Sequence, residues 1–150
     1  MEKKEEEEVT EIKRVVIEAV PHNDQRYNTI GDWFFEQSNA VYDTEKLVIR
    51  VSDTGNWKWN MTIALHEFVE AVLCTCDGVT QEQVDEFDTK WQPHDEVEEP
   101  GEDPKAPYHL YHTIAVDLET SFWLSMNHED DWDSYENKLD ELMKGYKHER

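Results

Sequence analysis

Basic residues are scarce in this chain. It has 14 Lys and Arg against 36 Asp and Glu in 150 residues, a formal net charge of −22. A surface this acidic repels nucleic-acid phosphate, so we expect no nucleic-acid binding. The same charge favours divalent cations and basic proteins as partners.

Cysteines and long apolar runs are also scarce. Cys74 and Cys76 are the only cysteines, and they lie one residue apart in a segment with a helical pattern. Side chains so placed on a helix point in different directions and make a poor disulfide, so we expect a reducing compartment, the cytoplasm. No run reaches membrane-spanning length, and the charge-dense start "MEKKEEEE" predicts no secretory signal. We expect an acidic disordered tail over residues 1–10 and a single domain over 11–150.

The pattern along this domain predicts an α+β fold. Two β-branched segments indicate strands, and the segment between them, with Gly31 and two Asn, indicates a loop or short hairpin. Four helical patterns follow, and an exposed acidic loop over 92–106 contains three prolines. Asn60 and Thr80 are the expected N-caps of the first two helices, and Asp133 and Glu136 have capping-box spacing in the fourth. The expected strands are 11–20 and 46–52, and the expected helices are 60–76, 81–91, 107–126 and 131–145.

The segment "IALHEFVEAVLC" (63–74) sets His66, Glu67 and Glu70 into an otherwise apolar helix. Burying an imidazole and two carboxylates is costly unless each finds a partner. The third helix offers a matching polar stripe, formed by His109, His112 and Glu119. Because imidazole and carboxylate are common metal ligands, the two stripes predict a metal site between these helices.

The motif is H-E-x-x-E, which differs from the zincin motif H-E-x-x-H in its last position. His66, Glu70 and His112 would supply two histidines and one carboxylate, the ligand set of thermolysin-type zinc. Glu67 is then placed to deprotonate a metal-bound water as the general base. Zinc is the expected metal, although manganese or iron would accept the same ligands with an added carboxylate.

The chain also resembles a group of uncharacterised small phage and bacterial proteins with a zincin-like fold. The resemblance covers about residues 26–135 and rests on "RYNTIGDW", "IRVSDTGNW", "HEFVEA", "EEPGEDPKAPYHLYH" and "DWDSY". It implies a zincin-like fold and a site formed by His66, Glu67, Glu70, His109 and His112. If the protein is phage-encoded, its compartment is the bacterial host cytoplasm. The resemblance brings no known substrate.

Other interpretations of the same residues remain open at this stage. The histidines and glutamates could form a metal-free buried network, and His109 and Glu119 could orient ligands instead of binding metal. Three functions compete: a peptidase-like hydrolase acting on a peptide or protein, a non-catalytic metal-binding protein, and an acidic decoy that mimics DNA and binds a basic host protein. Metal content separates the decoy from the other two.

Overall fold

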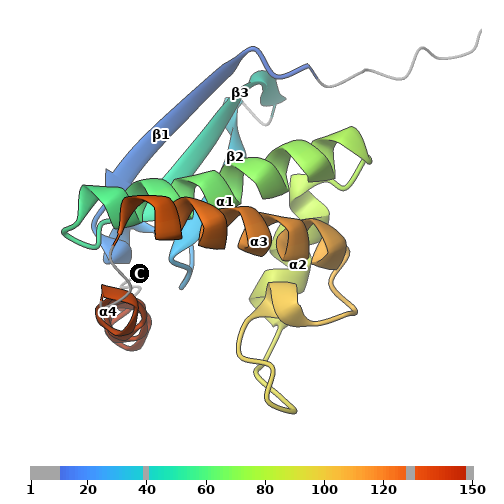
Figure 1. Ribbon diagram of the computed structural model, residues 1–150. Coiled ribbons are helices and arrows are strands. Elements are labelled where there is room, and N and C mark those ends of the chain that lie inside the picture. Colours follow the sequence, from blue (N-terminus) through green and yellow to red (C-terminus); the bar gives the residue numbers. More distant parts are fainter. Residues whose placement is uncertain (1–10, 39–40, 128–130, 148–150) are drawn as a thin grey trace, which may run out of the picture.

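The computed structural model describes residues 11–38, 41–127 and 131–147. Within them a three-stranded sheet of order β1-β3-β2 is followed by four α-helices (Figure 1). The strands are β1 (Arg14–Val20), β2 (Gly31–Ser38) and β3 (Val41–Ser52). The central strand β3 pairs parallel to β1 and antiparallel to β2. The expected α+β class with a small sheet is therefore confirmed.

The first two helices begin where side chains satisfy their free backbone N–H groups. α1 (Trp57–Cys76) is capped by Asn56, whose side chain accepts from Lys58 N and Trp59 N. α2 (Gln81–Lys90) has the expected Thr80 cap, completed to a capping box by Gln83. The positive φ of 75° at Gly78 lets the chain turn sharply between these two helices. Residues next to each boundary thus explain where α1 begins, where it ends and where α2 begins.

The remaining helices are α3 (His109–Met126) and α4 (Trp132–Lys144), and a short 3₁₀ turn, η2 (Pro100–Glu102), lies in the acidic loop before α3. α1 and α3 lie side by side below the sheet (Figure 1). Interlocked aromatic rings join α4 to this pair, with Trp132 4.9 Å from Trp123 and Tyr135 5.6 Å from Trp59 between ring centroids. One apolar core results, between the sheet and the two long helices.

Several expected elements differ from the structure, among them the second strand, which begins at Val41 and not at residue 46. The segment over 24–39 contains a full strand, β2, because Trp33 and Phe35 alternate into the core. α1 begins before Asn60, whose side chain instead accepts hydrogen bonds from the backbone and hydroxyl of Thr54. The predicted capping box of α4 does not form, since α4 begins after Asp131 and no side chain caps it. The predicted tail over 1–10 lies outside the described residues.

A buried polar network ties β2 to α2. The Arg26 guanidinium forms two hydrogen bonds to Asp32, at 2.7 and 2.9 Å, and two to Asp85, at 2.9 and 3.0 Å. Asp32 is only 3% exposed, so its charge depends on this pairing. Nearby, Asp88 accepts hydrogen bonds from two tyrosines, Tyr27 and Tyr108. These contacts hold α2 against the strand that also borders the candidate site.

Candidate metal site

Two helices bring three buried ligand-type side chains together. α1 supplies His66 and Glu70, one turn apart on the same face, and α3 supplies His112. One nitrogen or oxygen of each lies within 4.8 Å of the others, and all three residues are buried. This group of residues could hold a metal ion.

The two distances from Glu70 to the histidines suit a tetrahedral ion. Glu70 Oε2 lies 3.2 Å from His66 Nε2 and 3.2 Å from His112 Nδ1. Ligand atoms about 2.0–2.1 Å from a tetrahedral metal are separated from one another by about 3.3 Å. The carboxylate oxygen is therefore spaced from both imidazoles as neighbouring ligands would be.

In His66 and Glu70, the side-chain polar atom that points away from the group also has a hydrogen-bond partner. His66 Nδ1 lies 2.9 Å from Glu119 Oε2, and the Tyr135 hydroxyl donates to Glu119 Oε1 at 3.2 Å. Trp33 Nε1 donates to Glu70 Oε1 at 3.3 Å. Carboxylates that bind the far nitrogen of a histidine are the usual outer partners of metal-ligating imidazoles. The structure thus places Glu119 behind His66, in the orienting position that is one of the two alternatives the sequence allows.

The His112 ring is held against the turn η2. Its Nε2 is buried without a hydrogen-bond partner among the described residues, and Glu99 Oε2 lies 3.9 Å away. Gly101 of η2 packs on the ring so closely that an added Cβ would lie 2.4 Å from Nδ1. A glycine is needed here because of this close approach. The acidic loop therefore closes one side of the candidate site.

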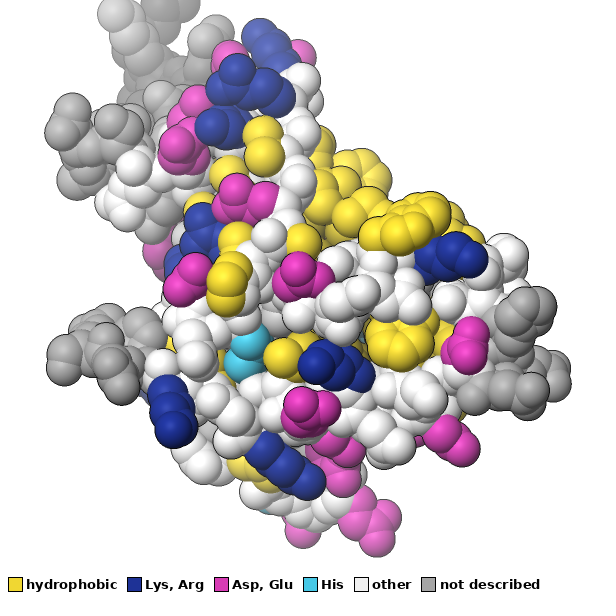
Figure 2. Space-filling model, turned by 90° about the vertical axis from the view of Figure 1, so that its left-hand side faces the viewer, with side chains coloured by type: hydrophobic (Ala, Val, Ile, Leu, Met, Phe, Trp, Pro, Cys, Tyr) yellow, Lys and Arg dark blue, Asp and Glu magenta, His cyan; other side chains and the backbone are white. Residues whose placement is uncertain are grey.

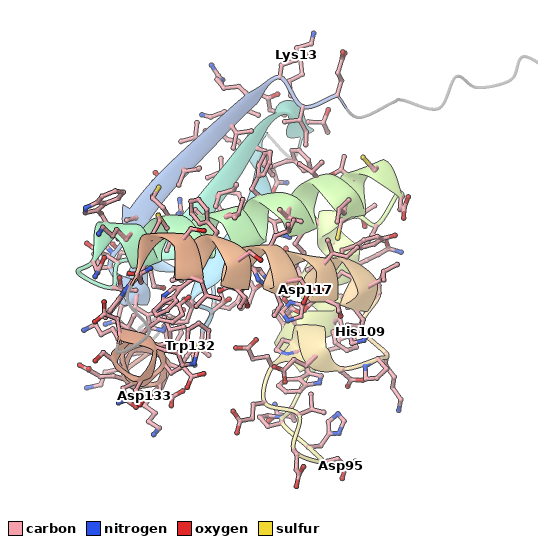
Figure 3. The ribbon with its side chains drawn as sticks, viewed as in Figure 1. Lys13, Asp95, His109, Asp117, Trp132 and Asp133 are labelled. Atoms are coloured by element: carbon pink, nitrogen blue, oxygen red, sulfur yellow. The ribbon has the colours of Figure 1, made fainter. Side chains whose placement is uncertain are left out.

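His109 does not join the buried group. Its Nδ1 donates to the Gly101 carbonyl at 2.9 Å, so the ring supports the turn that covers His112. Figure 3 shows His109 at the start of α3, beside the loop that carries Asp95. Its role in this structure is to position the loop.

Hydrogen bonds within the group shift the pKa values of its members. Burial alone would raise the pKa of Glu70, but hydrogen bonds from His112 and His66 outweigh it and lower that pKa to about 2. Burial alone would lower the pKa of His66, but its hydrogen bonds to Glu119 and Glu70 raise that pKa well above its usual range. Both nitrogens of His66 face carboxylate oxygens, and a neutral imidazole can donate from only one of them. A proton or a cation must therefore occupy the space between His66 Nε2 and Glu70.

The Glu67 side chain faces the sheet. Glu67 follows His66 in α1, so it lies on a neighbouring side of the helix from the ligand-type residues. It lies against Gly31 of β2, where an added Cβ would be 2.6 Å from its Oε1. Burial, followed by the charge of Glu70, raises the pKa of Glu67 well above its ordinary value. A carboxyl group with this pKa can take up and release a proton closer to neutral pH.

Sequence reasoning missed four residues around the site, because each belongs to an element whose path toward the site is set by the tertiary fold. Gly101 had one local signal, its place between a proline and acids in "EEPGEDP". The other three gave no sign of their role, since they resemble ordinary core or loop residues. They are Trp33, Glu99 and Tyr135.

Comparison of the chain with known protein families, curated proteins and solved structures finds no match. Among the described residues, no helix combines the length and apolar character needed to cross a membrane. The case for function thus depends on the geometry of the site.

Proposed function

We propose that the protein binds one divalent metal ion, zinc, through His66 Nε2, Glu70 Oε2 and His112 Nδ1. The observation that carries the proposal is the position of Glu70 Oε2, 3.2 Å from a nitrogen of each histidine. Two imidazoles and one carboxylate match the ligand composition of catalytic zinc sites that keep a fourth position open. The carboxylate behind His66 supports the same assignment, because it would fix the ring with Nε2 toward the metal.

We further propose that the activity is metal-dependent hydrolysis of a peptide or protein, in a zincin-like arrangement. A bound zinc ion supplies Lewis acidity and lowers the pKa of a coordinated water to about 7. Glu67 is the candidate proton acceptor, because it follows His66 directly and its pKa is raised by burial. Gly31 leaves the space that this side chain needs.

A metal that only stabilises the fold is the second candidate. It is favoured by the burial of the three residues, since His66, Glu70 and His112 are at most 9% exposed. The packing of η2 on His112 also restricts access from that side. A structural site of this kind would join α1 to α3 and contribute directly to folding stability.

Metal content tests the first step. We expect tag-free protein purified without chelator to contain about one zinc per chain by elemental analysis. His66→Ala and His112→Ala should each lose the metal, whereas His94→Ala, which changes an exposed histidine in the acidic loop, should retain it. Full metal content in both site variants would show that the ion is bound elsewhere.

Glu67→Gln then separates the catalyst from the structural site. Loss of a general base leaves the metal bound but should lower the hydrolysis rate by a factor on the order of 10² or more. The assay is digestion of a peptide library by wild type and variant at equal zinc occupancy, with Glu82→Gln on the exposed side of α2 as the matched control. Equal cleavage by both would remove Glu67 from catalysis, and cleavage by neither would favour the structural metal.

A further inference from the structure

The inner face of the sheet is only partly covered. Register places Val15, Ile17 and Ala19 of β1 beside Leu47, Ile49 and Val51 of β3, so all six side chains are on the face that α1 packs against. The three β3 residues are 0% exposed. Val15 and Ile17, by contrast, are 37% and 45% exposed. The helix layer therefore ends before it reaches β1.

The side of α1 that faces away from the core is also apolar. Met61, Leu65, Phe68 and Val72 follow one another at helical spacing, and Phe68 is 38% exposed. At the start of the helix Trp57 is 68% exposed. Figure 2 shows hydrophobic side chains gathered into a continuous patch on this side of the molecule. Apolar patches of this kind mark interaction sites.

The exposed side of α1 carries almost no charge, although the chain has 36 acids. α1 contains three charged residues, of which Glu67 and Glu70 face the interior and only Lys58 is exposed. A basic partner would thus find no carboxylate on α1 to pair with here. The acidic segment 1–10 has too few apolar residues to cover it. An equally apolar, uncharged surface is the better match, and a second copy of the chain has one.

The free edge of β1 is complementary to itself. In the described residues β1 pairs with β3 alone, so alternate backbone groups along its other edge can bind another strand. If β1 meets its own copy antiparallel with Val16 at the centre, Arg14 lies opposite the partner's Glu18, and Val15 lies opposite the partner's Ile17. Opposite charges then face each other twice on the outer face, and the exposed apolar residues meet on the inner face.

We propose that the protein is a two-fold symmetric dimer in which β1 strands pair antiparallel to form one six-stranded sheet. The uncovered inner residues of each β1 are then buried between the two copies, together with the outer side of each α1. An isologous contact of this type uses the same patch on both subunits and closes without further growth. The dimer does not depend on a metal ion, because no residue of the candidate metal site takes part.

Sedimentation of the full chain tests this proposal. We expect wild type at about 50 µM and physiological salt to sediment with twice the chain mass. Because each copy carries −22, lowering the salt to about 10 mM should weaken the dimer as screening is lost. A monomer at all concentrations up to about 200 µM in physiological salt would overturn the proposal.

Two variants locate the interface. Ile17→Asp should raise the dimer dissociation constant at least about 100-fold, because each copy would bury an unpaired carboxylate. Arg14→Glu, at an exposed position where misfolding is not expected, should raise it by about tenfold, since like charges would then face each other twice. Lys13→Glu makes the same charge change one residue before β1 and should have a smaller effect than Arg14→Glu. An unchanged circular-dichroism spectrum would show that each variant is folded. A dissociation constant equal to that of wild type in folded Ile17→Asp, or in Arg14→Glu, would refute this interface.

Discussion

The loss of metal affinity should become smaller, step by step, as substitutions move outward from the ligand group. The chain of contacts runs from His66 Nδ1 to Glu119 at 2.9 Å, and from Glu119 to the Tyr135 hydroxyl at 3.2 Å. His66→Ala removes a ligand and should abolish stoichiometric binding. Glu119→Gln keeps the shape of the side chain but removes the charge that fixes and polarises the ring.

The structure sets the expected size of each step. Loss of an outer carboxylate partner of a ligating histidine typically costs 10- to 100-fold in metal affinity, so we expect a decrease of about 30-fold for Glu119→Gln. Tyr135→Phe removes one neutral donor to Glu119, worth about 1 kcal/mol, and should lower the affinity about fivefold. Both variants should remain folded, because neither leaves a large cavity.

Competition of the metal-free protein with a chromogenic zinc chelator measures these affinities. Glu136→Gln on the exposed side of α4 is the matched control and should bind zinc like wild type. If Glu119→Gln loses zinc as completely as His66→Ala, then Glu119 is itself a ligand. If it has no effect, the contact between Glu119 and His66 does not tune the site, and the reasoning fails.

Three further changes probe the surroundings of the site. Gly101→Ala should displace the His112 ring, because the added Cβ would lie 2.4 Å from Nδ1. Zinc affinity in the same competition assay should fall by about tenfold or more. Unchanged affinity would show that η2 can move to make room for the Cβ. Arg26→Leu should lower the free energy of unfolding in urea by about 3 kcal/mol, because Asp32 would keep a buried, unpaired charge; a loss below about 1 kcal/mol would contradict this. Burial raises the pKa of Asp88 to about 7. The folded state therefore holds a proton on this carboxyl group that the unfolded chain releases near pH 4. Between these two pH values the free energy of unfolding should fall as the pH rises. Asp88→Asn should flatten that decline in urea titrations at pH 5 and 8, and an equally steep decline in the variant would assign it to other groups.

The sequence by itself determined which residues form the candidate site. His66 and Glu70 are one helical turn apart in an apolar segment, so local periodicity places them on one face whatever the rest of the fold does. His112 could be paired with them because its helix has the only comparable polar stripe. The α+β class and the Thr80 cap were likewise readable, since both depend on short-range patterns.

Only the tertiary structure decided how these residues are surrounded. Trp33 reaches Glu70 because β2 joins the edge of the sheet beside α1, and Tyr135 reaches Glu119 because aromatic rings dock α4 on α3. Gly101 meets His112 through the path of a loop, and the exposed edge of β1 follows from the width of the helix layer. These contacts join residues far apart in the chain, and local propensity contains no information about such distances. Packing of the whole core sets them, so the sequence could name the ligands but not the residues that orient and cover them.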